Sequence, residues 1–232
     1  MNNPKTRDLV LAACAAALLG GCATPTAAQI IISEIMYNPD SHEGGIGDNA
    51  PPNQTEWLEI YNTGDEAVSI AGWYLQDEDG QTVGLPTDAS IAPGEAIVLI
   101  PGTQTDDDFR AAWETDDVKG FQVFALSGWA VGDDPMSNLA NGPSATNEVL
   151  TLRDAEGEVV DEVNYDDEDA WPTDSPDGSS ITLRPDQLDA EANDEGSAWA
   201  RSAEGELGAR QNTKTDDYNG TDTGSPGVVT AE

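Results

Sequence analysis

Short apolar runs separated by turn-forming residues follow one another along the chain from Ile30 onward. The run "IIISEIMYNP" ends in an Asn-Pro pair, which is typical of a strand that stops at a turn. In "EWLEIYN", Leu58 and Ile60 share one face of an extended chain, and the residues between and beside them share the other. Residues 96–100 are all apolar, and this predicts a strand buried on both faces.

A second group of strands is predicted in the later part of the chain. The stretch "EVLTLRDAEGEVVDEVNYD" alternates on both sides of a short turn that contains Gly157, as a β-hairpin does. "GSSITLRP" predicts a further short strand. Short strands at intervals of roughly 8–12 residues predict an all-β chain folded as a sandwich.

One helix is expected, near residues 106–114 in "TDDDFRAAWETDD". Phe109 and Trp113 are four residues apart and therefore lie on one helical face. We expect Asp106 or Asp107 to cap the amino end, since carboxylates accept hydrogen bonds from the first backbone N–H groups.

The chain is strongly acidic, with 45 Asp+Glu against 9 Lys+Arg and a formal net charge of −36. Binding to a phosphate backbone needs cationic groups that displace counterions, so we expect no nucleic-acid partner. Self-repulsion at this charge destabilises the compact state unless salt screens it, and in about 1 M salt the Debye length is only ~3 Å. The composition therefore favours the hypothesis of a secreted protein from saline water.

The first residues have the layout of an export signal. Two basic residues, Lys5 and Arg7, precede an apolar stretch at residues 9–19 that is too short to span a bilayer. The sequence Leu19-Gly20-Gly21-Cys22 resembles the bacterial lipobox, in which the peptide is cut before a cysteine whose thiol is acylated.

This resemblance implies a cut between Gly21 and Cys22 and a lipid anchor on Cys22. We therefore predict a signal peptide at residues 1–21, a tether at residues 22–29 and one domain at residues 30–230. Ala23 after the cysteine implies sorting to an outer membrane, if the cell has one. The alternative is an ordinary signal peptide that contains an incidental cysteine.

Several spaced blocks together resemble the lamin tail domain family. They include "IIISEIMYNP", "EWLEIYNTGDEAVSIAGWYLQDEDG", "IAPGEAIVLIP", "NEVLTLRDAEGEVVDEVNYD" and the closing elements "GSSITLRP", "SAWARS" and "GSPG". The best-matched core is residues 30–185, followed by an acidic, polar segment at residues 186–230. The resemblance implies an immunoglobulin-like sandwich that serves as an adhesive or interaction module, or accompanies exported enzymes as an extra domain.

The acidic residues of the signature stretch are candidates for chemistry. Glu56 and Glu59 are separated by an odd number of positions, so in a strand they point to opposite faces. They are then poorly placed to act on one substrate atom as an acid–base pair. We expect one of them to orient nearby backbone and the other to be solvated.

Two acidic clusters offer oxygen ligands of the kind that Ca²⁺ prefers. The weak candidates are Asp77 and Asp79 in the first cluster and Asp166 and Asp167 in the second. Neither cluster follows the spacing of a calcium-binding loop, so the alternative is that they form turns and an acidic coat.

Few other motifs point to catalysis. The chain has one histidine, His42, and no serine in a Gly-x-Ser-x-Gly context. Among the tryptophans, Trp129 is the candidate for an exposed recognition residue, although core packing is the default for it. The sequence thus favours a non-catalytic interaction or scaffolding module on the cell envelope, with an unknown envelope protein or polymer as partner. The alternative is an accessory or catalytic component of extracellular hydrolysis, with Ca²⁺ as its candidate cofactor.

Overall fold

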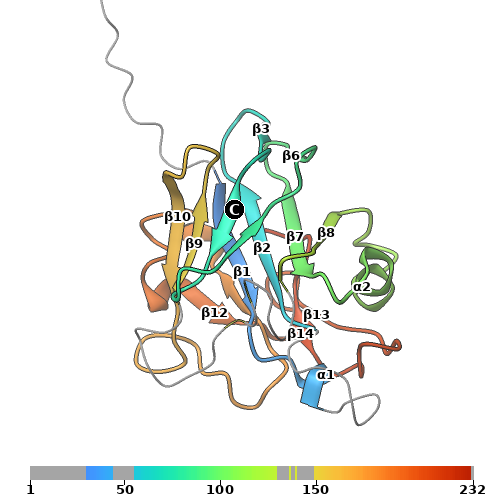
Figure 1. Cartoon of the computed structure of the whole chain (residues 1–232). Helices are drawn as coiled ribbons and strands as arrows, with labels where there is room; N and C mark the ends of the chain where they lie inside the picture. The colour runs from blue at the N-terminus through green and yellow to red at the C-terminus, as the bar shows by residue number, and fades with distance from the viewer. Residues whose placement is uncertain (1–29, 44–54, 130–135, 137–138, 140–148, 231–232) are drawn as a thin grey trace, which may run out of the picture.

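Two β-sheets face each other across the main core of the protein (Figure 1). The structure is a computed structural model that describes residues 30–43, 55–129, 136, 139 and 149–230. The larger sheet has six strands in the order β12-β11-β1-β2-β7-β8, and the β7–β8 pair is parallel. Its strands are β1 (Ile30–Met36), β2 (Trp57–Asn62), β7 (Ala96–Pro101), β8 (Gln122–Leu126), β11 (Ile181–Leu183) and β12 (Trp199–Arg201).

The smaller sheet has four strands in the order β10-β9-β4-β5. These are β4 (Tyr74–Gln76), β5 (Thr82–Gly84), β9 (Val149–Arg153) and β10 (Val159–Asn164). Two short ribbons add β3 (Val68–Ser69) with β6 (Ser90–Ile91), and β13 (Arg210–Gln211) with β14 (Thr223–Gly224). The helical elements are α1 (Asp40–Glu43), α2 (Asp106–Trp113), η1 (Pro185–Gln187) and η2 (Gly196–Ala198).

The main core lies between the two sheets. Leu58 and Ile60 from β2 join Leu75 from β4 and Leu152 from β9 in one buried cluster, as the alternation in the sequence predicts. The predicted hairpin is also confirmed, since β9 and β10 pair in antiparallel register around the turn that holds Gly157. An all-β sandwich with one short helix is therefore the observed fold class.

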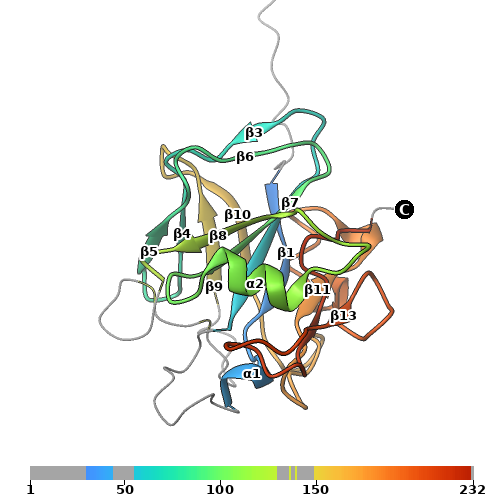
Figure 2. The same cartoon turned by 90° about the vertical axis from the view of Figure 1, so that its right-hand side faces the viewer.

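A second core lies on the other face of the six-stranded sheet, beneath α2 and the C-terminal part of the chain (Figure 2). Phe109 and Trp113 of α2 pack edge-on against Trp57 of β2, with ring centroids 6.1 Å and 5.7 Å away. Tyr218 from the C-terminal part packs against the same two helix side chains. Burial of β7 on both faces follows, because Val98 faces this second core while its neighbours face the first.

The predicted helix is present, but its predicted cap is wrong. Asp106 and Asp107 lie inside the helix, and the preceding Thr105 is the N-cap. The Thr105 backbone is extended, and its hydroxyl accepts the N–H of Asp108 at 3.2 Å. Asp106 instead accepts the N–H of Ala125 in β8.

Residues 186–230 are more than an acidic coat. They supply the edge strand β12 and the β13–β14 ribbon, and they bury Trp199 and Tyr218. Among the described residues, no helix is both long and apolar enough to cross a membrane.

Candidate functional site

Two carboxyl groups meet on the face of the six-stranded sheet that looks toward the second core. Glu34 of β1 and Glu59 of β2 are directly opposite each other in the strand register. Side chains at such opposed positions lie on the same face, with Cβ atoms roughly 4.5–5.5 Å apart. Both side chains are buried, with exposed fractions of 0% and 1%. This arrangement requires hydrogen-bond partners for both groups, because an unpaired buried carboxyl is costly.

The partners of Glu34 come largely from the end of the chain. Its carboxyl accepts the backbone N–H of Ser225 at 2.7 Å and the Ser225 hydroxyl at 2.6 Å. The hydroxyl of Ser180 also donates to Glu34 and lies 2.7 Å from that of Ser202. Burial raises the pKa of Glu34, and these hydrogen bonds offset the rise in part.

Glu59, on the neighbouring strand β2, also accepts a hydrogen bond from the end of the chain. It accepts the Ser33 hydroxyl and the backbone N–H of Gly227, each at 2.7 Å. Burial and the nearby Glu34 carboxyl raise the pKa of Glu59 to about 8. Because burial disfavours the charged form of both groups and Glu34 adds repulsion at Glu59, the pair holds a proton at neutral pH.

A single guanidinium accompanies the pair. Arg210 of β13 interacts electrostatically with both Glu34 and Glu59, although burial lowers its own pKa. It donates to the carbonyl oxygens of Trp113 at 2.6 Å and Pro226 at 2.7 Å. One cation against two carboxyls leaves a local charge of zero only when the pair keeps one proton.

Residues 225–228, "SPGV", form the closing turn, in which the N–H of Val228 donates to the carbonyl of Ser225 at 2.9 Å. Gly227 has a positive φ of 78°, and a Cβ there would lie 2.4 Å from the ring of Phe121. At Gly224, just before the turn, a Cβ would lie 2.8 Å from Trp57 and 3.2 Å from Glu34. Glycine is therefore required at both positions for the chain to approach the carboxyl pair.

The two acidic residues of the signature stretch do not converge. Glu56 is also buried, and it accepts the N–H of Leu139 at 2.9 Å, far along the chain from the partners of Glu59. Burial raises the pKa of Glu56 well above its usual value. The expectation that one of the two is solvated is wrong, because each one satisfies a backbone N–H inside the protein.

Two further buried carboxyls brace other junctions. Asp161 of β10 accepts the N–H of Ile32 at 2.6 Å, at the irregularity in β1, and the side-chain amide of Asn193 at 2.8 Å. Burial raises the pKa of Asp161 to about 7. Asp222 accepts the N–H groups of Asp40 and Ser41, so it ties the end of the chain to α1.

The calcium candidates lie in separate turns. Asp77 accepts the N–H of Gln81 at 2.7 Å in the turn between β4 and β5, which also contains Asp79. Asp166 accepts the N–H groups of Asp167 and Glu168. In the part of the chain that the structure describes, no group of three or more His, Cys, Asp or Glu residues is arranged to hold a metal ion.

Trp129 is a core residue. Its side chain has an exposed fraction of 0% and belongs to the cluster between the sheets. Core packing, the default expectation for this residue, is therefore confirmed, and its candidacy as an exposed recognition aromatic is wrong. The backbone N–H of Trp129 donates to the carbonyl of Leu126, and the carbonyl of Trp129 accepts the N–H of Gly102. These two hydrogen bonds anchor the chain directly after β8. The glycines and prolines that follow Trp129 in the sequence are typical of an exposed loop, so the sequence alone does not reveal its packing.

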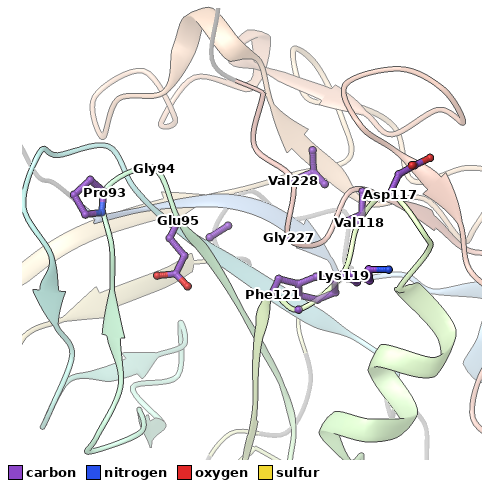
Figure 3. A pocket seen from close by; sticks show the side chains of 11 residues that line it. Pro93, Gly94, Glu95, Asp117, Val118, Lys119, Phe121, Gly227 and Val228 are labelled. Atoms are coloured by element: carbon purple, nitrogen blue, oxygen red, sulfur yellow. The ribbon is translucent and has the colours of Figure 1, made fainter.

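A surface hollow of about 530 Å³ lies beside the closing turn (Figure 3). Phe121 forms part of its lining, with Glu95 on one side and Asp117 and Lys119 on the other. Gly227 and Val228 of the closing turn supply a further wall. Glu95 accepts the side-chain amide of Gln122 at 2.8 Å and the N–H of Ala92 at 2.7 Å, so its carboxylate is used within the protein.

Comparison with known proteins assigns the family. Residues 23–167 match the Lamin Tail Domain. The chain belongs to this family. The lamin tail match includes the signature strand with Glu56 and Glu59 and ends just after β10, before the strands and the closing turn that complete the fold.

Two other comparisons add little to this assignment. The chain has 14% identity and a TM-score of 0.42 with the crystal structure of a DUF4876 family protein from Bacteroides thetaiotaomicron VPI-5482, covering 89% of this chain and 72% of that one. A search of curated proteins found no match.

Glu34, Asp161 and Asp222 are not among the site residues that the sequence predicts. A signal was available for Glu34, which interrupts an otherwise apolar strand in "IIISEIM". A charged residue in a strand that is buried on both faces needs a partner, and the register with β2 supplies Glu59. Asp161 and Asp222 lie in acidic surroundings, where nothing in the sequence separates them from surface carboxylates.

Proposed function

We propose that this lamin tail domain protein is an exported, lipid-anchored module that acts through binding or scaffolding and not through catalysis. The non-catalytic part of the proposal rests on the carboxyls with raised pKa values, which are occupied by hydrogen bonds within the protein. Glu34, Glu56 and Glu59 are enclosed and accept hydrogen bonds from the protein's own backbone. Acid–base catalysis needs such groups within hydrogen-bond reach of a substrate.

The proposed anchor rests on the sequence around Cys22. These residues lie outside the part of the chain that the structure describes, and the similarity to a lipobox is the support for acylation. The eight-residue tether of residues 22–29, about 28 Å long if fully extended, would hold the sandwich close to the membrane surface. A module held in this way is suited to binding an envelope protein or polymer.

The anchor is tested with the variant Cys22→Ser, which removes the thiol that would be acylated. We expect the variant protein to move from the membrane fraction into the soluble fraction after cell lysis. The matched control is Cys14→Ser, which changes the other cysteine, within the apolar part of the signal, and should leave the protein in the membrane fraction. Membrane retention of the Cys22→Ser protein would refute the anchor.

The binding role is tested by cross-linking in intact envelopes. We expect wild type and Glu59→Gln to cross-link to the same partner, since the altered carboxyl is internal to the fold. A folded Glu59→Gln protein that keeps its partner but loses a hydrolytic activity seen with the wild type would overturn the non-catalytic role.

A further inference from the structure

We propose that the closing turn is a proton-gated strap, which stays closed while the Glu34–Glu59 pair keeps a proton and opens when that proton is lost. This inference goes beyond the proposed function and is independent of the membrane anchor. It rests on where the hydrogen bonds of the closing turn end.

The polar attachments of the closing turn end on three titratable side chains. Ser225 donates its N–H and its hydroxyl to Glu34, and Gly227 donates its N–H to Glu59. The carbonyl of Pro226 accepts from Arg210. The preceding strand β14 is fixed differently, through backbone bonds of Thr223 to Gly178 and Ser180. Loss of a proton from the carboxyl pair therefore affects the hydrogen bonds of the turn. The hydrogen bonds of β14 are unaffected, so β14 can serve as the hinge.

The charges around the pair are few. Arg210 from β13 is the cation that acts on both carboxyls, and Glu114 at the end of α2 acts on Arg210. The remaining polar neighbours are the hydroxyls of Ser33 on β1 and of Ser180 and Ser202 beside β11 and β12. Loss of the proton that the pair holds leaves two carboxylates against one guanidinium in a buried site, which is costly. Opening of the turn relieves this cost because water then reaches both carboxylates.

Opening has a consequence for the adjacent hollow. Gly227 and Val228 form one of its walls, and Gly227 lies directly against the ring of Phe121 (Figure 3). In the closed state Phe121 has an exposed fraction of 9%. Release of the turn removes that wall and uncovers the aromatic ring, so the proton controls access to an apolar surface.

The proton linkage fixes the direction and the size of the effect. Burial and Glu34 raise the pKa of Glu59 from 4.5 to about 8 in the closed state, and exposure to water returns it toward 4.5. Between these two values the closed state holds one proton more than the open state. The opening constant then rises about tenfold per pH unit between about pH 5 and pH 8, and it levels off above pH 8.

Hydrogen exchange measured by mass spectrometry tests the proposal on the full chain, with salt held constant and intrinsic exchange rates corrected. We expect the protection of a peptide that covers residues 225–228 to fall about tenfold per pH unit between pH 5 and pH 8. Protection of a peptide from α2 should exceed that of residues 225–228 at every pH in this range, because opening of the turn leaves the helix folded. Glu59→Gln should weaken the pH dependence in the closing turn, with Glu34 left as the one titrating carboxyl of the pair.

Asp161→Asn is the matched control, because it removes a buried carboxyl of raised pKa that does not contact the closing turn. This variant should keep the pH dependence of residues 225–228. Constant protection of the closing turn in the wild type would overturn the proposal. Protection of the turn equal to that of α2 at every pH would overturn it too, because the turn would then open only by global unfolding. The wild-type series decides the matter by itself if Glu59→Gln does not fold.

Discussion

At the scale of single residues, the carboxyls that look most like an active site are parts of the framework. Glu34, Glu59 and Glu56 each accept a backbone N–H from a distant part of the chain. A carboxyl can satisfy several donors at once, so it suits junctions where irregular backbone is buried without a strand partner. The chain that approaches Glu34 and Glu59 is correspondingly restricted to glycine at positions 224 and 227.

Gly227→Ala tests this restriction. We expect it to lower the free energy of unfolding by about 2 kcal/mol or more, because the new methyl group meets Phe121 and the positive φ is strained. Urea unfolding measures the effect. Gly120→Ala is the matched control, since Gly120 has a similar φ of 77° with no atom within 4 Å of the added Cβ. An equal loss in both variants would mean that backbone strain alone is responsible and that the contact with Phe121 contributes nothing.

At the scale of elements, the sequence pattern predicts those strands and helix faces that local periodicity determines. The strands around Leu58 and Leu152 and the buried face of α2 follow from alternation and from the spacing of Phe109 and Trp113. The pairing of Glu34 with Glu59 depends on strand register, which periodicity does not reveal. The docking of the closing turn depends on a contact between residues 191 positions apart, Glu34 and Ser225.

The cap of α2 gives a test at this scale. Thr105→Ala should lower the free energy of unfolding by about 1 kcal/mol, because the N–H of Asp108 loses its acceptor. Asp107→Ala is the comparison, since Asp107 lies inside the helix and contributes only attraction to the helix dipole. In about 1 M NaCl that attraction is screened, and the variant should unfold close to the wild type. A larger loss of unfolding free energy for Asp107→Ala than for Thr105→Ala would indicate that the aspartate, and not Thr105, caps the helix.

At the scale of the whole molecule, the charge of −36 is spread over a surface with little internal compensation. Within the described residues, one ion pair is found, between the half-buried side chains of Arg110 and Glu114, and pairs near the surface contribute about 0–1 kcal/mol. Repulsion among the remaining carboxylates is a cost that salt reduces.

We therefore expect the melting temperature to rise steeply with NaCl between about 0.1 M and 2 M, as screening shortens the Debye length. Differential scanning calorimetry at constant pH measures this rise. An uncharged osmolyte at equal osmolality serves as the control for effects other than screening. A melting temperature that does not respond to NaCl would remove the link between the acidic surface and a saline environment.

The pH dependence of global stability tests most directly the claim that the signature carboxyls serve the fold. The pKa values of Glu59 and Asp161 are raised to about 8 and about 7 in the folded protein. Stability from a raised pKa is fully present below the unfolded pKa and is lost as the pH rises through the folded one. The free energy of unfolding should therefore fall from pH 5 to pH 8, by at most about 1.4 kcal/mol per pH unit for each proton.

The decisive measurement is urea unfolding of the wild type and Glu59→Gln at pH 5 and pH 8, in about 1 M NaCl to screen surface charge. The glutamine side chain can accept the N–H of Gly227 and donate to Ser33 while remaining neutral. We predict that the wild type loses stability between pH 5 and pH 8 and that Glu59→Gln loses distinctly less. A wild type that gains stability toward pH 8, with Glu59→Gln weakest there, would contradict the account.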